Sequence, residues 1–420
     1  MQYLLLLVLV VSASVQADGL NQLITKALNT HPDLAVQEAR LEIANTQLDL
    51  AKEQFYPTFS VSVENVAKTR DADRNFGSDQ AVATFRLQQT LYAFGRLRAS
   101  EAKFAAGVDS QTLALEEIKL ELAQSVLQAW GEWYAAELRL DAVFKNKQTH
   151  EELRDSVSRR AEKGASSPSE VRLSEARLAQ VEAQLANAQL QAEAAKVKLE
   201  QLVGEPLAQT AEPRQFLDYA LGERSQMVMQ ALSIHPTLMR FAADIKQSEA
   251  EVEEQIAALG PELYLRAEHQ RGDFATDIPF QNRVFIGFQS DFGAGSSALM
   301  EVKLAEQRIT TLKAEVEVVK RDVTERVKLE LTQLRLLDVR QEALELSLSA
   351  NEDIAKAFNR QYLAGRRSWV EVMNTARELS QAELELAELK AAKVLSYWRL
   401  SFLVNGVTGT LAASQPISMN

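Results

Sequence analysis

The sequence predicts a mainly α-helical fold with a small β part, assembled from two similar halves. The segment Ala27–Leu34 (ALNTHPDL) returns about 200 residues later as Ala231–Leu238 (ALSIHPTL), far beyond any solenoid period. Only 16 glycines and 9 prolines occur among 420 residues, which favours long uninterrupted helices. Each half also has two short segments in which apolar and polar residues alternate, as expected for strands with two unlike faces.

The composition excludes several classes of protein. The 46 Lys and Arg residues against 58 Asp and Glu give a net charge of -12, so we expect no nucleic-acid partner. This charge suits cations, or a passage that disfavours anions. The chain has no cysteine, which excludes thiol catalysis, thiolate zinc sites, disulfides and a lipid-modified N-terminal cysteine.

The N-terminus predicts a cleaved signal peptide over residues 1–17. Leu4–Val11 is an unbroken apolar run, and small residues in Val15–Ala17 precede the expected cleavage point, although a positively charged start is missing. The alternative, a membrane anchor, needs about 20 apolar residues, and this run is shorter. No other stretch is long and apolar enough for a transmembrane helix, so any entry into a membrane would use strands. The mature chain then divides into two helix-strand-strand-helix repeats, residues 18–215 and 216–420.

In the first repeat, we expect a helical region over 18–54 that is interrupted at His31-Pro32 and ended by Pro57. Alternation predicts strands over 59–64 and 81–91, separated by a charged loop over 69–79. In the second strand Phe85 and Leu87 share one face, and Thr84, Arg86 and Gln88 share the other.

A very long helix is predicted over 96–163, roughly 100 Å at 1.5 Å per residue. It ends at a turn over 164–168, and Ser169 is the expected cap of the returning helix. Apolar residues recur in that helix every seven positions, which predicts a left-handed coiled coil: Val171, Leu178, Leu185, Ala192 and Leu199.

The second repeat follows the same order after a linker over 204–222. Gly260-Pro261 ends a helix, and strands are predicted around 263–267 and 284–288, with a loop over 272–281 between them. A long helix begins near Ser296 and turns at Ala364-Gly365. The last helix has Val372, Leu379 and Leu386 in the same phase as Val171, Leu178 and Leu185.

Four strands cannot close into a barrel by themselves. An open sheet edge is costly in lipid, and bacterial membrane barrels start at about eight strands. Either the four strands form a small soluble sheet, or several chains contribute four each. Three chains would give about twelve strands, and their helices would form an α-helical tube.

The chain resembles the TolC family of outer-membrane efflux and secretion ducts over essentially its whole mature length. The resemblance depends on the duplicated plan, the Ala-Leu-x-x-His-Pro-x-Leu opening of each half and Tyr56-Pro57 before the first strand. It also depends on Gln89–Gly95 (QTLYAFG), and on a glycine followed by Glu-Val at both hairpin turns: Gly164 with Glu170-Val171, and Gly365 with Glu371-Val372.

The resemblance implies a homotrimer in the cell outer membrane that extends into the periplasm. Its expected fold is a twelve-stranded barrel, four strands per chain, continued by a periplasmic α-helical coiled-coil barrel. The family closes its periplasmic tip by linking tyrosine and arginine to acidic residues. The matching residues here are Tyr362 and Arg367, with Glu170 on the acidic side. Glu371 and Asn374 stand where the family often has two aspartates, and Arg366 could pair with Glu371.

Simpler interpretations of these residues remain open. Tyr362 could be a packed aromatic near a turn, and Arg366 and Arg367 could be solvated charges. Gly164 and Gly365 would first of all be helix C-caps, and are also the expected adaptor contacts at the hairpin tips.

Neither a catalytic site nor a metal site is predicted. The four histidines, His31, His150, His235 and His269, have no ligand spacing. No nucleophile-base-acid set is visible, so we expect a protein that is not an enzyme and uses no cofactor.

The predicted function is a passive outer-membrane duct of a tripartite export system, for type I protein secretion or efflux. A periplasmic adaptor (a membrane fusion protein) would open the tip, and an inner-membrane transporter, ABC or proton-driven, would supply energy. Outer-membrane lipid would surround the barrel. The alternative is a periplasmic structural coiled coil or adaptor whose strands form a soluble sheet.

Overall fold

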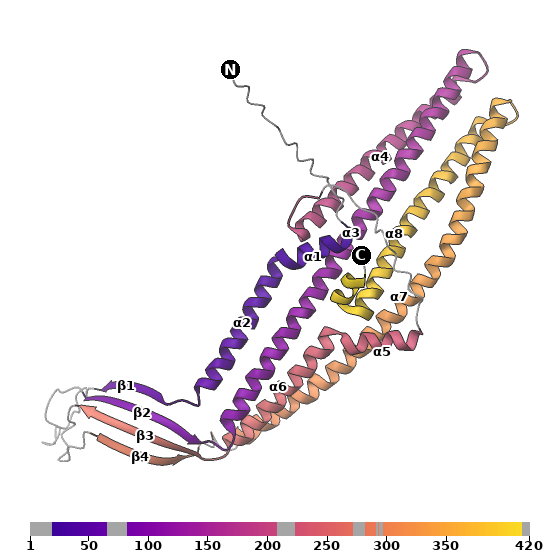
Figure 1. Cartoon of the computed structure of the whole chain (residues 1–420). Helices are drawn as coiled ribbons and strands as arrows, with labels where there is room; N and C mark the ends of the chain where they lie inside the picture. Colours follow the sequence, from indigo (N-terminus) through magenta and orange to yellow (C-terminus); the bar gives the residue numbers. More distant parts are fainter. Residues whose placement is uncertain are drawn as a thin grey trace, which may run out of the picture. The chain divides into compact units, whose positions relative to one another are not determined.

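The computed structural model describes residues 19–64, 82–207, 223–271, 282–290, 293 and 297–413. The predicted signal peptide and the predicted loops over 69–79 and 272–281 lie outside these residues, as does most of the predicted linker. Six elements of the first half are repeated in the same order in the second (Figure 1). The first half contains α1 (Leu20–Thr30), α2 (Pro32–Glu53), β1 (Thr58–Glu64), β2 (Val82–Tyr92), α3 (Arg96–Glu162) and α4 (Pro168–Val203).

The second half contains α5 (Arg224–Ile234), α6 (Pro236–Ala258), β3 (Glu262–Arg271), β4 (Asn282–Gln289), α7 (Ser297–Leu363) and α8 (Trp369–Ala413). The predicted fold class, mainly α with four strands and an internal repeat, is therefore confirmed. No helix among the described residues has an apolar stretch long enough to cross a membrane.

Contacts divide the chain into two compact units, and each unit draws on both halves of the sequence. The first unit comprises residues 1–34, 118–235 and 323–420, and the second comprises 35–117 and 236–322. The boundaries of the sequence repeats at 18–215 and 216–420 stay a prediction, since the units interleave the two halves.

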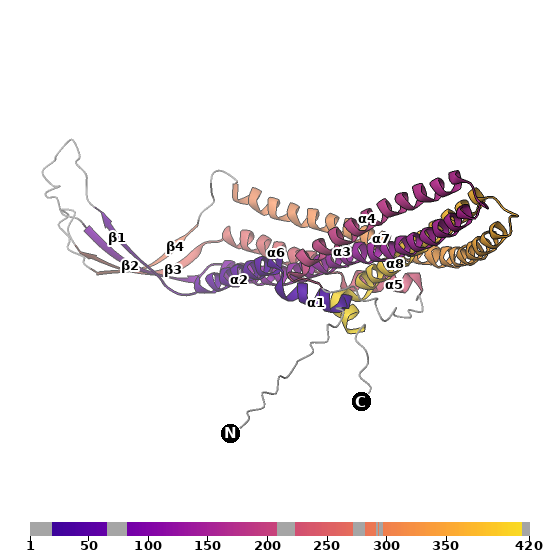
Figure 2. The same cartoon turned by 90° about the horizontal axis from the view of Figure 1, so that it is seen from above.

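The first unit is built on two long helical hairpins. In both views α3 lies alongside α4, and α7 lies alongside α8, with a short turn at the end of each pair (Figures 1 and 2). Both α3 and α7 have 67 residues and contain no proline. The buried side of α4 follows the predicted seven-residue pattern at Leu178, Ala192 and Leu199. Small side chains at this seam let neighbouring helices approach closely.

Glycine at residue 131 makes a close approach between α3 and α8 possible. A Cβ on Gly131 would lie 2.3 Å from Cδ2 and 2.6 Å from Cγ of Leu395. Nearby, Trp130 and Tyr134 stack with ring centroids 5.0 Å apart, and both are buried. The packing of this unit thus requires an unsubstituted Cα at residue 131.

The second unit holds a four-stranded antiparallel sheet in the order β1-β2-β3-β4. Leu87 lies opposite both Phe59 and Ala267, so these three residues share a face, as the alternation in the sequence predicts. The sheet connects to helices that are held together by polar contacts. For example, Glu117 of α3 accepts hydrogen bonds of 2.7 Å from both Thr237 and Arg240 of α6.

Candidate functional site: the tips of the helical hairpins

The two hairpin turns have the same backbone design. The N–H groups of Gly164 and Gly365, both with φ 71°, bond to the carbonyls of Ala161 and Tyr362 at 2.9 Å. The next N–H bonds five residues back in both turns, at 2.8 Å. This pair of bonds is a Schellman motif, in which glycine adopts the left-handed conformation without strain. Both glycines are therefore helix caps, as expected, and both are exposed.

Both returning helices also begin with a capping box. Ser167 and Glu170 exchange side-chain-to-backbone hydrogen bonds of 3.3 and 3.2 Å, and Ser368 and Glu371 do so at 3.4 and 3.0 Å. The expected cap at Ser169 is therefore wrong. Ser167 is the cap because Pro168 occupies the first helical position, where its missing N–H costs nothing.

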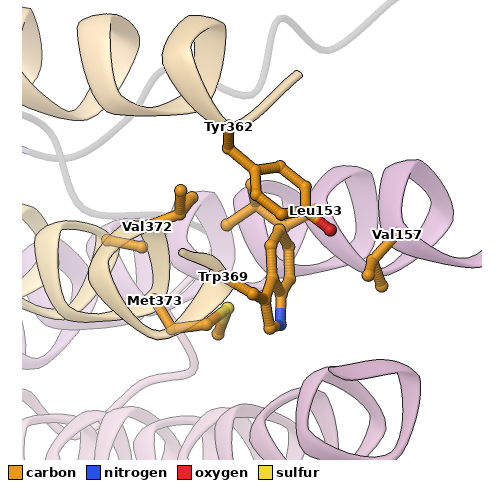
Figure 3. Close-up of a cluster of buried hydrophobic side chains, with 7 residues drawn as sticks. Leu153, Val157, Tyr362, Trp369, Val372 and Met373 are labelled. Carbon is orange, nitrogen blue, oxygen red and sulfur yellow. The ribbon is translucent and has the colours of Figure 1, made fainter. Parts of the chain in front are cut away.

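The two turns differ in the residue that follows the cap. Pro168 stands in the first turn and Trp369 in the second, and the side chain of Trp369 is 1% exposed. It lies in an apolar cluster with Tyr362 of α7, Val372 and Met373 of α8, and Leu153 and Val157 of α3 (Figure 3). The second tip therefore packs against the first hairpin within one chain.

Tyr362 joins the two tips through its ring and its hydroxyl. The ring is 4.9 Å from the Trp369 ring, and the guanidinium of Arg160 lies 4.9 Å from its centroid. Its hydroxyl is 2.8 Å from the hydroxyl of Ser166. Tyr362 is thus both a packed aromatic, as the simpler interpretation holds, and a polar link between the hairpins.

Arg160 is the second link between the tips. Its Nη1 donates to the carbonyl of Leu363 in the other hairpin at 2.9 Å, and its Nη2 donates to the carbonyl of Ala165 at 3.3 Å. One guanidinium therefore satisfies carbonyls at the ends of both α3 and α7 and also covers the Tyr362 ring. We name Arg160, Ser166 and Tyr362 the tip contact.

The other predicted latch residues lie within their own hairpins. Arg367 pairs with Glu371, donates to Gln361 at 3.0 Å and stacks 4.2 Å above the Phe358 ring. The carboxylate of Glu170 belongs to its own capping box. No ion pair between Glu170 and Arg367 is found in the described part of the chain. Tyr362 thus contacts the first hairpin, but its partners there are Arg160 and Ser166 and not Glu170.

The charges on the turns are mostly exposed. Hydrogen bonds from the backbone and side chain of Ser368, and then from Arg367, lower the pKa of the Glu371 carboxyl. Asn374 and Arg366 are exposed. The expected partner of Glu371 is Arg366, but in the structure Glu371 pairs with the next residue, Arg367.

Sequence reasoning missed Arg160 and Ser166. Comparison of the two turns could have drawn attention to them, because residues 160, 166 and 168 differ from 361, 367 and 369 at the constant offset of 201. No group of three or more potential metal ligands occurs among the described residues.

A duplicated helix-strand-strand-helix chain with paired hairpin tips defines the class of outer-membrane transport ducts. Residues 23–205 and 227–406 match the outer membrane efflux protein family, one stretch in each half, so the chain belongs to this family. The predicted localisation in the outer membrane is confirmed with it.

The individual proteins that the chain resembles share only a small fraction of identical residues with it. The alkaline protease secretion protein AprF of Pseudomonas aeruginosa is 24% identical over 352 residues, which are 79% of this chain and 70% of that protein. Crystal structures of CusC match 94% of this chain and 96% of that chain, with a TM-score of 0.80 and 17% identity. The outer membrane protein VceC of Vibrio cholerae matches 93% and 96%, with a TM-score of 0.75 and 17% identity.

Proposed function

We propose that this chain is a passive export duct that crosses the outer membrane and extends into the periplasm, closed at its hairpin tips until an adaptor opens it. The observation that carries the proposal is the tip contact, in which Arg160 and Ser166 of the first hairpin hold Tyr362 of the second. A periplasmic adaptor is the proposed partner at Gly164 and Gly365, where both turns are exposed. An inner-membrane transporter, ABC or proton-driven, supplies the energy, so the chain needs no catalytic step of its own.

The sheet supports a trimeric assembly. In one chain β1 and β4 are edge strands, and their unpaired backbone groups cannot face lipid. Three copies would join β4 of one chain to β1 of the next, giving twelve strands. An even number of antiparallel strands per chain keeps the joint antiparallel as well. Outer-membrane lipid would then surround a closed barrel.

Opening is a change between two packings of the same tip. The second hairpin must leave α3, which breaks the hydroxyl contact of Tyr362 and the bond from Arg160 to Leu363. Trp369 must also leave its cluster or move with it. An adaptor that binds only the parted tips favours that state by its difference in affinity for the two. The two polar contacts are worth about 1 kcal/mol each, and the adaptor must also offset the exposure of the apolar cluster around Trp369.

Type I protein secretion is the proposed use, because a relative over most of this chain is named a protease secretion protein. Efflux of small molecules is the second use, in line with the name of the family. The alternative of a periplasmic structural coiled coil has no support from that family.

Extraction and native mass test the proposal. The mature protein should stay with the outer membrane when cells are opened without detergent. In mild detergent its mass should be about three times that of the chain, as twelve strands require. Recovery from the soluble periplasm, or a monomer in detergent, would overturn the proposal. A tip variant such as Arg160→Gln is a control, because Arg160 belongs to the first unit and the strands belong to the second, and it should leave both results unchanged.

A further inference from the structure

One face of the four-stranded sheet carries a group of arginines. Residues directly opposite one another in the register share a face, and Arg86, Glu268 and Arg283 lie in one row across β2, β3 and β4. Arg266 lies in the adjacent row, opposite Gln88. These two central rows hold three arginines and one glutamate, so their net charge is +2 in a chain whose total is -12.

Each arginine is fixed by a neighbour on the same face. Arg86 donates to Glu268 at 2.8 Å, Arg266 to Gln88 at 3.0 Å, and Arg283 to Gln270 at 2.7 Å. Glu268 also lies 4.0 Å from Nη1 of Arg266, so one carboxylate serves two guanidinium groups, and of the three arginines only Arg283 is oriented by an amide alone. Three guanidinium charges per chain therefore share one carboxylate in these two rows, which leaves a local positive excess for passing solutes.

Tyr264 and Gly287 together support the side chain of Arg266. Its guanidinium lies 4.7 Å from the centroid of the Tyr264 ring. That ring lies over Gly287 of the neighbouring strand, where a Cβ would be 2.6 Å from its Cζ. A glycine at 287 therefore lets the tyrosine lie across the sheet, and the tyrosine supports the arginine.

The opposite face of the sheet is apolar and exposed in the single chain. Phe59 and Val61 of β1 are 65% and 51% exposed, and Val284, Ile286 and Phe288 of β4 are 72%, 71% and 76% exposed. A strand in a membrane barrel turns its apolar side to lipid and its polar side to the lumen. The arginine face is therefore the lumen side, an assignment that rests on the proposed function.

We propose that Arg86, Arg266 and Arg283 form an arginine belt that gives the membrane part of the duct a preference for anionic groups, such as the carboxylates of its cargo. Guanidinium groups bind carboxylates in a fixed two-point geometry, and rings of basic side chains select anions in pores. In the two central rows, three chains would present nine arginines and three glutamates, while Glu64 and Glu262 lie on the same face toward its ends. The belt thus acts against the cation preference that the net charge of the chain suggests.

The absence of cysteine provides a direct test. Ser60 lies opposite Arg86 on the arginine face, and Val61 follows it on the apolar face. We would make Ser60→Cys and Val61→Cys in the full chain and measure modification by an anionic and a cationic thiosulfonate. Each rate is divided by the rate of the same reagent with free cysteine, so that intrinsic reactivity cancels.

The belt predicts that Ser60→Cys reacts faster with the anionic reagent. A local potential of one kT changes the ratio of the two rates by about sevenfold, because the reagents differ by two charges. Adding Arg86→Gln and Arg266→Gln should bring the ratio close to one, whereas Arg266→Lys should preserve it. Val61→Cys should react slowly with both reagents. Ser62→Cys, two residues along the same face, is a second reporter if Ser60→Cys does not assemble.

The outcomes separate the belt from the proposed function. Ready modification of Ser60→Cys without a preference for the anion would overturn the belt and leave the duct intact. Protection of Ser60→Cys together with modification of Val61→Cys would overturn the lumen assignment, and with it both proposals.

Discussion

Tyr362→Phe is the most informative substitution at the tip because it removes one atom. The ring, its contact with Trp369 and its position beneath Arg160 all remain. Only the 2.8 Å contact between the Tyr362 and Ser166 hydroxyls is lost. A hydrogen bond of this kind stabilises a folded arrangement by about 1 kcal/mol.

The effect on opening follows from the number of tips that must part together. If three chains open in one step, the closed state loses about 3 kcal/mol relative to the open state. A difference of 1.4 kcal/mol is tenfold, so the ratio of open to closed channels rises by about 150-fold. Independent opening of each chain would instead give about fivefold per chain.

Single-channel recording of the full-length protein in planar bilayers measures this ratio. Ser166→Ala should have at least the same effect, because it also removes the 3.4 Å bond from Nε of Arg160 to the Ser166 hydroxyl. The double variant should add little to Ser166→Ala, because both changes remove the bond between the two hydroxyls. Tyr56→Phe is the matched control, since Tyr56 is 64% exposed and lies beside the strands rather than at the tip. An open probability for Tyr362→Phe equal to that of the wild type and of Tyr56→Phe would refute the tip contact as a latch.

Three further changes test the packing and the electrostatics of the first unit. Gly131→Ala should destabilise the protein by about 1–3 kcal/mol in denaturant unfolding, because the new Cβ overlaps Leu395; wild-type stability would contradict the close approach. Ser368→Ala should destabilise the start of α8 by about 1 kcal/mol at neutral pH, and amide hydrogen exchange there should be faster by the corresponding factor. That loss should shrink as pH falls through the lowered pKa of Glu371, because the protonated carboxyl no longer completes the capping box. Burial, and then Arg177, lower the pKa of His150, so the unfolded chain takes up a proton at a higher pH than the folded chain does. Stability should therefore fall as pH drops through the ordinary histidine range, and His150→Gln should flatten that part of the thermal unfolding profile between about pH 8 and about pH 5.

The repeat and the periodicity of the sequence were sufficient to predict the order of helices and strands. Alternation at Phe59, Val61 and Phe85 identified strands because one face of each must differ from the other. Seven-residue spacing at Leu178 and Leu185 identified the seam of α4. Such patterns are local, so a single sequence reveals them.

The contacts at the tip are not local, and the sequence predicted them only in part. Arg160 and Leu363 are more than 200 residues apart, and no spacing rule connects them. The cap at Ser167 could have been found, since proline favours the first helical position and serine the one before it.

The arginine belt illustrates the same limit on the sheet. Alternation placed Arg86 on the polar face of its strand, but the order of the strands puts Glu268 and Arg283 beside it. Net charge predicted a passage that disfavours anions, whereas the two central rows of this face have a net charge of +2. The net charge of a chain sums over surfaces that are exposed to different solutes.

Reconstitution of the purified full-length protein into planar bilayers tests the central claim most directly. An export duct predicts discrete conductance steps from an assembly of about three chain masses, with more frequent opening in the Tyr362→Phe variant. A folded protein of that mass that leaves the bilayer without conductance, in both the wild type and Tyr362→Phe, would contradict the account.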